Sequence, residues 1–265
     1  MTETLGSMPT LVITGGTGYL GRELVRVAPA FGWLVRATWW TNEPSDEAEW
    51  VQLDIRDREA MRAAVAGADA VVHTAYRQND DAWSINVDGS ESVALAAAGT
   101  RLVHISSDIV FSGARGRYIE SDATEPVNEY GRSKLAAEQR VAAVHPSAAL
   151  VRTSLIYGGP EPGPQERLAK EGTRFFVDEF RSPVQVDDLA HAVLEVVELD
   201  VSGPLHVAGA DDLSRFDFAV LLGADPNRIE GTNTNPDRAP NVTLDISRAQ
   251  SLLTTRLRGA TEVLT

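Results

Sequence analysis

The stretch Leu11-Val12-Ile13-Thr14-Gly15-Gly16-Thr17-Gly18-Tyr19-Leu20-Gly21 decides the fold class. It begins as an apolar run of the kind found in strands buried on both faces of a parallel sheet. It continues as a glycine-rich turn, and a helical pattern follows over residues 22–30. The order strand, glycine turn, helix is the context that a dinucleotide-binding turn requires. A turn that serves only chain reversal is the weaker interpretation.

The glycines of this turn have the spacing GxxGxxG, and each has a separate task. Gly15 allows the tight turn, Gly18 the close approach of a pyrophosphate, and Gly21 the close packing of the helix on the sheet. The backbone amides at the start of the helix then face the anion. We therefore predict that the turn binds a nicotinamide dinucleotide.

The alternation of apolar runs and helical patterns continues along the chain and predicts βαβ units in a doubly wound parallel sheet, the α/β Rossmann fold. We expect this domain to span residues 9–157. From residue 158 a segment rich in Gly and Pro excludes helix and central strand. Residues 158–265 are predicted to form mainly a small, interleaved substrate-binding lobe, with 181–208 returning to the Rossmann sheet. The further apolar runs are 33–35, 70–72 and 102–105, and the helical patterns are 57–66 and 90–98.

The composition excludes several classes of protein. The 265 residues include no cysteine, which rules out disulfides and thiolate metal sites. The net charge of −14 argues against a nucleic-acid partner, and the absence of a long apolar run or a signal peptide argues against a membrane partner. The five histidines show no paired ligand spacing, so no metal site is predicted. We expect a cytoplasmic monomer or homodimer that acts on a small molecule.

The region after the second strand bears on the choice of cofactor. In NAD-binding proteins of this fold, a carboxylate after that strand accepts a hydrogen bond from the ribose 2′-hydroxyl. Residues 36–42 contain no carboxylate. This absence favours NADP(H) over NAD(H). Further on, Asp54 and Ile55 end another apolar run. The Asp54 carboxylate either contacts the adenine amino group or is an acidic residue near the start of the next helix.

A reactive pair follows in the middle of the chain. Tyr130 and Lys134 are four residues apart, so they share one face of a helix. A phenol exchanges a proton near neutrality only if a nearby cation lowers its pKa, and Lys134 is placed to be that cation. Upstream, Ser106 and Ser107 end a predicted central strand, where open α/β sheets bind ligands. The alternatives are an exposed Tyr–Lys pair and a simple strand-end cap.

Six segments together resemble the extended short-chain dehydrogenase/reductase family, and within it the dTDP-4-dehydrorhamnose reductase group. Their order along the chain is also that of the family. Ile109 departs from the pattern because it replaces the usual tyrosine, and residues 161–176 lack the longer helical region that covers the substrate in typical members. The matching segments are 14–21, 69–75, 86–89, 106–113, 130–134 and 151–158.

The resemblance implies a role for each matching residue. Tyr130 donates a proton to the carbonyl oxygen, Lys134 tunes it, Ser107 orients the carbonyl, and Asn86 supports the proton relay. Substrate contacts are implied for Ser107, Asp108 and Arg181. The implied cofactor-binding residues are Gly15, Thr17, Gly18, Tyr19, Leu20, Gly21, Asp54, Ile55, Thr74, Ala75, Tyr130 and Lys134.

We therefore expect an NAD(P)H-dependent reductase of a carbonyl group on a nucleotide-activated sugar or a related small molecule, with hydride coming from the cofactor. Two alternatives stay open. The first is a non-catalytic subunit that binds the dinucleotide and regulates or supports a partner. The second is a sugar-nucleotide epimerase or dehydratase of the same family, which would recycle its cofactor.

Overall fold

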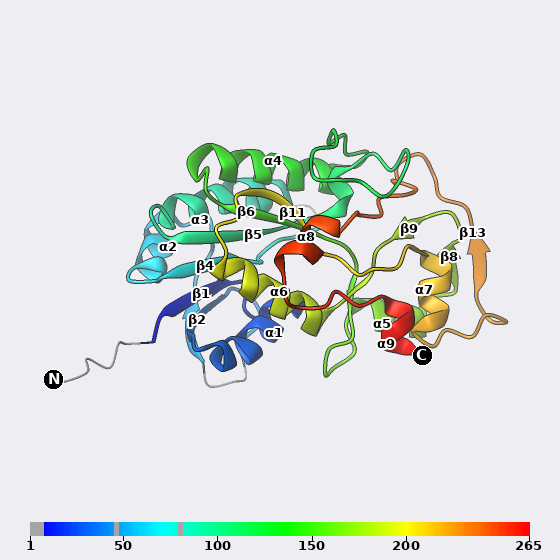
Figure 1. The fold of residues 1–265 in the computed structure, drawn as a ribbon, viewed down its shortest axis with the longest axis horizontal. Helices are drawn as coiled ribbons and strands as arrows, with labels where there is room; N and C mark the ends of the chain where they lie inside the picture. The colour runs from blue at the N-terminus through cyan, green and yellow to red at the C-terminus, as the bar shows by residue number, and fades with distance from the viewer. Residues whose placement is uncertain (1–7, 45–47, 79–81) are drawn as a thin grey trace.

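A computed structural model of the chain describes residues 8–44, 48–78 and 82–265. Its centre is a seven-stranded, entirely parallel sheet in the order β11-β6-β5-β4-β1-β2-β3, which confirms the predicted fold class. Figure 1 shows the sheet on the side of the molecule where the N-terminus lies, with helices on both of its faces. The strands are β1 (Thr10–Thr14), β2 (Leu34–Trp39), β3 (Glu49–Gln52), β4 (Ala70–His73), β5 (Arg101–Ser107), β6 (Ala149–Thr153) and β11 (Gly203–His206).

The sheet is held between two apolar layers. Leu11 and Ile13 of β1 belong to the core on one face and Val12 to the core on the other, and all three are fully buried. This alternation follows from the two-residue period of a strand. Helices α1 (Tyr19–Val27) and α6 (Val186–Glu198) contact each other on one face, and α2 (Arg58–Val65), α3 (Ser90–Ala96) and α4 (Glu129–Val144) cover the other.

The structure extends some of the predicted elements. The strand expected at 33–35 begins at Leu34 and runs to Trp39, because Thr38 and Trp39 continue its pairing with β3. A short π-helix, η2 (Ser84–Gly89), precedes α3 and carries Asn86. Asp57 accepts hydrogen bonds from the amides of Glu59 and Ala60 and caps the start of α2.

Apart from residues 181–208, much of the chain after β6 forms short elements beside the carboxyl ends of the strands (Figure 1). Within residues 181–208, α6 packs on the sheet and β11 extends it by pairing with β6. No helix in the described part of the chain is long and apolar enough to cross a membrane. The remaining elements are η1 (Ala28–Phe31), η3 (Asp108–Val110), β7 (Ile156–Tyr157), α5 (Pro164–Glu171), β8 (Arg174–Phe176), β9 (Phe180–Arg181), β10 (Val184–Gln185), β12 (Leu213–Ser214), α7 (Arg215–Leu221), β13 (Glu230–Thr232), α8 (Ser247–Leu252) and α9 (Ala260–Leu264).

Candidate active site

The glycine turn between β1 and α1 leaves no room for side chains. Gly15 has a φ of +70°, and a Cβ there would lie 2.8 Å from the Cα of Ala75. The Gly18 amide donates to the Gly15 carbonyl at 2.9 Å, and a Cβ on Gly21 would collide with that same carbonyl. The backbone of the turn therefore requires glycine at positions 15 and 21, whereas a Cβ at Gly18 would be crowded by the Gly15 carbonyl oxygen at 3.1 Å.

Gly16 has a role that the sequence analysis missed. A Cβ at this position would lie 2.6 Å from the ring of Trp50, which packs against the turn from β3. The Gly16 amide also donates to the Thr38 carbonyl at 2.8 Å. The pair Gly15-Gly16 was visible in the sequence, but nothing there indicated that a tryptophan from a third strand would occupy the space.

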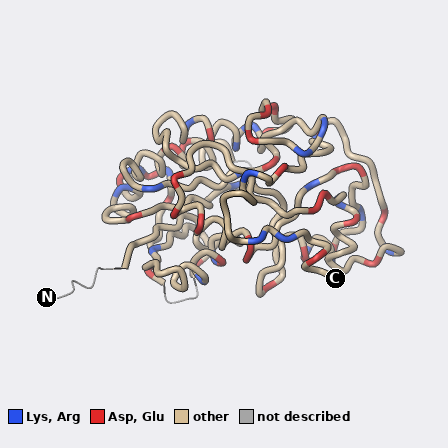
Figure 2. Tube along the Cα trace, in the orientation of Figure 1, with Lys and Arg blue, Asp and Glu red and all other residues tan. Residues whose placement is uncertain are grey.

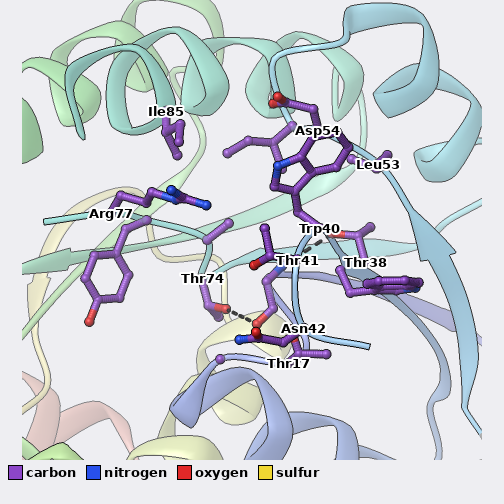
Figure 3. Close-up of a pocket in the computed structure, with 16 residues that line it drawn as sticks. Thr17, Thr38, Trp40, Thr41, Asn42, Leu53, Asp54, Thr74, Arg77 and Ile85 are labelled. Carbon is purple, nitrogen blue, oxygen red and sulfur yellow. Dashed lines mark hydrogen bonds between the residues drawn. The ribbon is translucent and has the colours of Figure 1, made fainter. Parts of the chain in front are cut away.

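A pocket of about 200 Å³ opens above this turn (Figure 3). It brings together the ends of β1, β2, β3 and β4, as expected for the carboxyl edge of a parallel sheet. Leu20 and Gly21 lie in α1 and do not line the pocket. The Tyr19 hydroxyl instead accepts a hydrogen bond from the Gly159 amide at 2.8 Å. The predicted cofactor-binding residues that do line the pocket are Gly15, Thr17, Gly18, Asp54, Ile55, Thr74 and Ala75.

The pocket lining also contains residues that the sequence analysis did not assign to the site. The end of β2 supplies polar and aromatic groups without a carboxylate, in keeping with the sequence of that region. Trp39 and Trp40 both line the pocket although successive side chains of a strand point to opposite faces, because Trp40 lies beyond the last residue of β2. The residues added by the structure are Thr38, Trp39, Trp40, Thr41, Asn42, Leu53, Tyr76, Arg77 and Ile85.

Asp54 lines the pocket, but its carboxylate already has a partner. Both of its oxygens accept hydrogen bonds from the Arg56 guanidinium, and Oδ1 also accepts from the Arg56 amide at 2.9 Å. These bonds hold the pKa of Asp54 below its usual value. The residue that caps the following helix is Asp57 and not Asp54.

Ser107, Tyr130 and Lys134 lie together at the carboxyl edge of the sheet. Asn128 caps α4 by accepting from the Gly131 amide at 2.8 Å, and this fixes the first helical turn that carries Tyr130. The side chains of Gln78 and Ser107 lie near the Tyr130 hydroxyl and both act to lower its pKa, against the larger effect of burial. The Tyr130 ring lies 6.1 Å from that of Tyr76, which links the Ser–Tyr–Lys group to the pocket.

The sequence analysis expected Lys134 to lower the pKa of Tyr130, but the structure gives a different result. Burial raises the pKa of Tyr130 above 10, and burial lowers the pKa of Lys134 to about 8. The Lys134 ammonium donates to the Ile105 carbonyl at 2.7 Å and lies 5.6 Å from the Tyr76 ring. The phenol thus loses hydration without direct pairing to the ammonium, so it stays protonated at neutral pH.

Asn86 is almost fully buried and positions the chain after β4. Its amide oxygen accepts from the Arg77 backbone amide at 2.8 Å, and its nitrogen donates to the Arg77 carbonyl at 2.8 Å. The same nitrogen donates to Ser133 at 2.9 Å, between the two reactive positions of α4. Asn86 therefore connects the pocket wall to the helix of Tyr130 and Lys134.

The predicted substrate contacts Asp108 and Arg181 are buried and mutually attractive. The Asp108 carboxylate accepts from Ser107 at 3.0 Å and from Ser154 at 2.6 Å. Burial raises the pKa of Asp108, and the nearby Arg181 opposes that rise. Arg181 itself pairs with Glu179 at 3.0 Å and donates to the Ala239 carbonyl. Within the described ranges, no group of three or more His, Cys, Asp and Glu residues could hold a metal ion.

A doubly wound sheet with a GxxGxxG turn, and with serine, tyrosine and lysine gathered at the same edge, defines a protein of the extended short-chain dehydrogenase/reductase class. The chain belongs to the family described as the RmlD substrate binding domain, whose model matches residues 9–261. This match confirms the group that the sequence motifs indicated.

Comparisons with individual proteins agree with the family. The chain is 38% identical over 266 residues to a dTDP-4-dehydrorhamnose reductase of Mycolicibacterium smegmatis, covering 91% of this chain and 78% of that protein. The structure of a dTDP-4-dehydrorhamnose reductase from Bacillus anthracis in complex with NADP matches with a TM-score of 0.80 and 25% identity, covering 97% of each chain. A methionine adenosyltransferase 2 subunit beta from Bos taurus is 28% identical over 91% of this chain and 82% of its own. The expectation of an oxidoreductase is thus confirmed at the level of the family.

Proposed function

We propose that the chain is an NADPH-dependent reductase that converts the keto group of a dTDP-4-keto-6-deoxy sugar, such as dTDP-4-dehydrorhamnose, to an alcohol. The observation that carries the proposal is the proximity of Ser107 and Tyr130, with a buried Lys134 one helical turn further along α4, next to the dinucleotide pocket. The similarity to reductases of this substrate class supports the choice of sugar.

The residues of the pocket fit a dinucleotide. Gly15 excludes a side chain and Gly18 carries none, so backbone amides at the start of α1 can approach a pyrophosphate. Thr41 and Asn42 offer neutral polar groups after β2, where a carboxylate would repel a 2′-phosphate. We therefore favour NADPH over NADH. When bound, the cofactor supplies hydride to the carbonyl carbon.

The chain's own groups then handle the proton. Ser107 orients the substrate carbonyl by hydrogen bonding to its oxygen, and the Tyr130 hydroxyl gives its proton to that oxygen as negative charge develops there. The phenolate left behind is stabilised by the Lys134 ammonium, which is mostly protonated at pH 7 because its pKa is about 8. Asn86 keeps the pocket wall and α4 in register through its bonds to Arg77 and Ser133.

The test is the oxidation of NADPH in the presence of dTDP-4-dehydrorhamnose. Tyr130→Phe should lower kcat by about 10²- to 10⁴-fold, the usual contribution of a general acid, while NADPH binding persists. Tyr157→Phe is the matched control, because the buried Tyr157 hydroxyl has no hydrogen-bond partner among the described residues. Wild-type activity should also fall as the pH rises above about 8, where Lys134 loses its proton. Unchanged turnover in the Tyr130→Phe variant contradicts the mechanism.

A regulatory subunit is the second candidate, because the bovine relative is named as a subunit of methionine adenosyltransferase. NADPH binding without turnover, together with a stoichiometric partner enzyme, would favour that role. Consumption of NADPH in step with product excludes both this role and an epimerase or dehydratase that recycles its cofactor.

A further inference from the structure

Lys134 differs in kind from almost all other cations of the chain. Of the 24 basic residues only two, Lys134 and Lys170, are lysines, and Figure 2 shows basic and acidic residues interspersed along the trace. A lysine ammonium can lose its proton when it is buried, whereas a guanidinium stays charged. Lys134 is 4% exposed, so its charge depends on the groups that surround it.

No carboxylate of the described residues forms a salt bridge with this buried ammonium. Glu138, one turn further along α4, raises the pKa of Lys134, but its carboxylate is paired with Arg152 at 2.8 Å. From the sheet, His73 of β4 and His104 of β5 face the ammonium, and burial holds the pKa of each below its usual value. Both histidines are therefore neutral at pH 7 and supply no counter-charge.

The carboxylates on the other elements packed against α4 are bonded elsewhere or exposed to solvent. Asp108 of η3 accepts hydrogen bonds from Ser107 and Ser154. Glu91 of α3 pairs with two exposed arginines, and Asp88 of η2 is exposed. The charge of Lys134 is therefore balanced mainly by groups that carry no net charge themselves.

Two such groups hold the ammonium. It donates to the Ile105 carbonyl at 2.7 Å, and it lies over the face of the Tyr76 ring, 5.6 Å from the ring centre. This distance is within the range of a cation–π contact, in which the negative face of the ring attracts the cation. The same ring lies 6.1 Å from that of Tyr130 and lines the dinucleotide pocket. Tyr76 thus lies where the reactive group meets the pocket.

We propose that Tyr76 is a positioning residue whose ring holds the Lys134 ammonium in its charged form beside Tyr130. The inference rests on the proposed function, because the charged Lys134 is the group that stabilises the Tyr130 phenolate after proton transfer. An apolar side chain without a ring would leave the ammonium with the Ile105 carbonyl, so Lys134 would lose its proton at a lower pH. A ring without the hydroxyl should replace Tyr76 well, because the attraction comes from the face of the ring.

Lys134 can be observed directly because the chain has only two lysines. Full-length protein that carries ¹³C at the lysine Cε atoms gives one NMR signal for Lys134 and one for the exposed Lys170 of α5, which is the internal reference. In the wild type the Lys134 signal should titrate with a midpoint of about 8. Tyr76→Leu should lower this midpoint by about 0.5–1 pH unit, the size expected for a cation–π contact, and Tyr76→Phe should leave it in place.

Trp83→Leu is the matched control. It removes an aromatic ring that is exposed to a similar extent, 47% for Trp83 against 52% for Tyr76, and it should leave the Lys134 midpoint unchanged. The exposure of both side chains also means that neither substitution opens a cavity in the apolar core.

The Tyr76 variants should also change the pH dependence of the reaction. Oxidation of NADPH with dTDP-4-dehydrorhamnose requires protonated Lys134, so the rate falls as the pH rises through the Lys134 midpoint. The fall in kcat should therefore begin about 0.5–1 pH unit lower in Tyr76→Leu than in the wild type, and Tyr76→Phe should restore the wild-type profile. The KM for NADPH is determined separately, because Tyr76 also lines the pocket.

Several outcomes overturn the inference. An unchanged midpoint in Tyr76→Leu excludes the cation–π contact, and a higher midpoint means that the ring acts on Lys134 by excluding water. An equal fall in Tyr76→Leu and Tyr76→Phe assigns the effect to the hydroxyl and not to the ring. If Tyr76→Leu does not fold, Tyr76→Met replaces it with the same expectation. A shifted midpoint in a protein whose wild type does not reduce the sugar nucleotide overturns the proposed function, while the contact of Tyr76 with Lys134 stands.

Discussion

The glycine turn and the ion-pair cluster of the C-terminal lobe are built in opposite ways. The turn, residues 14–21, consists of consecutive residues whose backbone groups contact one another. In the lobe cluster, Arg238 comes from a distant position in the chain and pairs with Glu179, which also pairs with the nearby Arg181. Glu179 is 2% exposed and accepts from Arg238 at 2.6 and 2.8 Å.

Because of this difference, we expect the turn and the lobe cluster to respond to different kinds of substitution. The turn depends on the absence of side-chain atoms, so it should respond to added volume. The lobe cluster depends on balanced buried charge, so it should respond to the loss of a single charge even when shape is kept. Substitutions that change only the volume or only the charge of a side chain can therefore test whether the turn and the lobe cluster differ in this way.

The largest effect is expected in the lobe cluster. Glu179→Gln keeps the size of the side chain but removes the salt-bridge partner of Arg181, which is 5% exposed. Removing one member of a buried pair typically costs about 3–5 kcal/mol of stability. We expect a loss of this size in the free energy of unfolding, measured by urea denaturation.

Glu230→Gln provides the control in the same lobe. Glu230 pairs with Arg174 at 2.9 Å, but both side chains are more than half exposed. Exposed pairs contribute about 0–1 kcal/mol, so this variant should remain close to the wild type. Similar losses in the two variants would show that burial of the charge does not distinguish the lobe cluster.

A smaller effect is expected in the turn. Gly15→Ala introduces a Cβ 2.8 Å from the Ala75 backbone at a φ of +70°, so we expect a destabilisation of about 1–3 kcal/mol and a clear loss of NADPH affinity. Gly32→Ala isolates the conformational strain, because Gly32 has a φ of +85° and open space around its Cα. It should bind NADPH normally. Thermal unfolding and calorimetry measure the two quantities, and normal NADPH binding by Gly15→Ala would refute the steric argument.

The same contrast explains which features the sequence could predict. The turn, the central strands and the Tyr130–Lys134 spacing depend on neighbouring residues, so periodicity and motif spacing were enough to predict them. The contact of Trp50 with Gly16 joins two strands, and the partners of Asp54 and Arg77 depend on side-chain rotamers. The raised pKa of Tyr130 depends on burial, which the spacing of Tyr130 and Lys134 did not reveal. These features required the three-dimensional arrangement.

The smallest effect is expected at Asp54, for which the sequence allowed a contact with adenine. Its carboxylate is bonded to Arg56, and the side chains of this pair are 21% and 41% exposed. Such a pair contributes at most about 1 kcal/mol, so Asp54→Asn should change stability little. NADPH affinity should change by less than about threefold, because the ligand would otherwise have to break the Arg56 bonds before it could use the carboxylate. Calorimetry decides between the two interpretations. A tenfold loss of NADPH affinity would mean that Asp54 exchanges Arg56 for the adenine amino group, so that this charge serves the ligand as well as the fold.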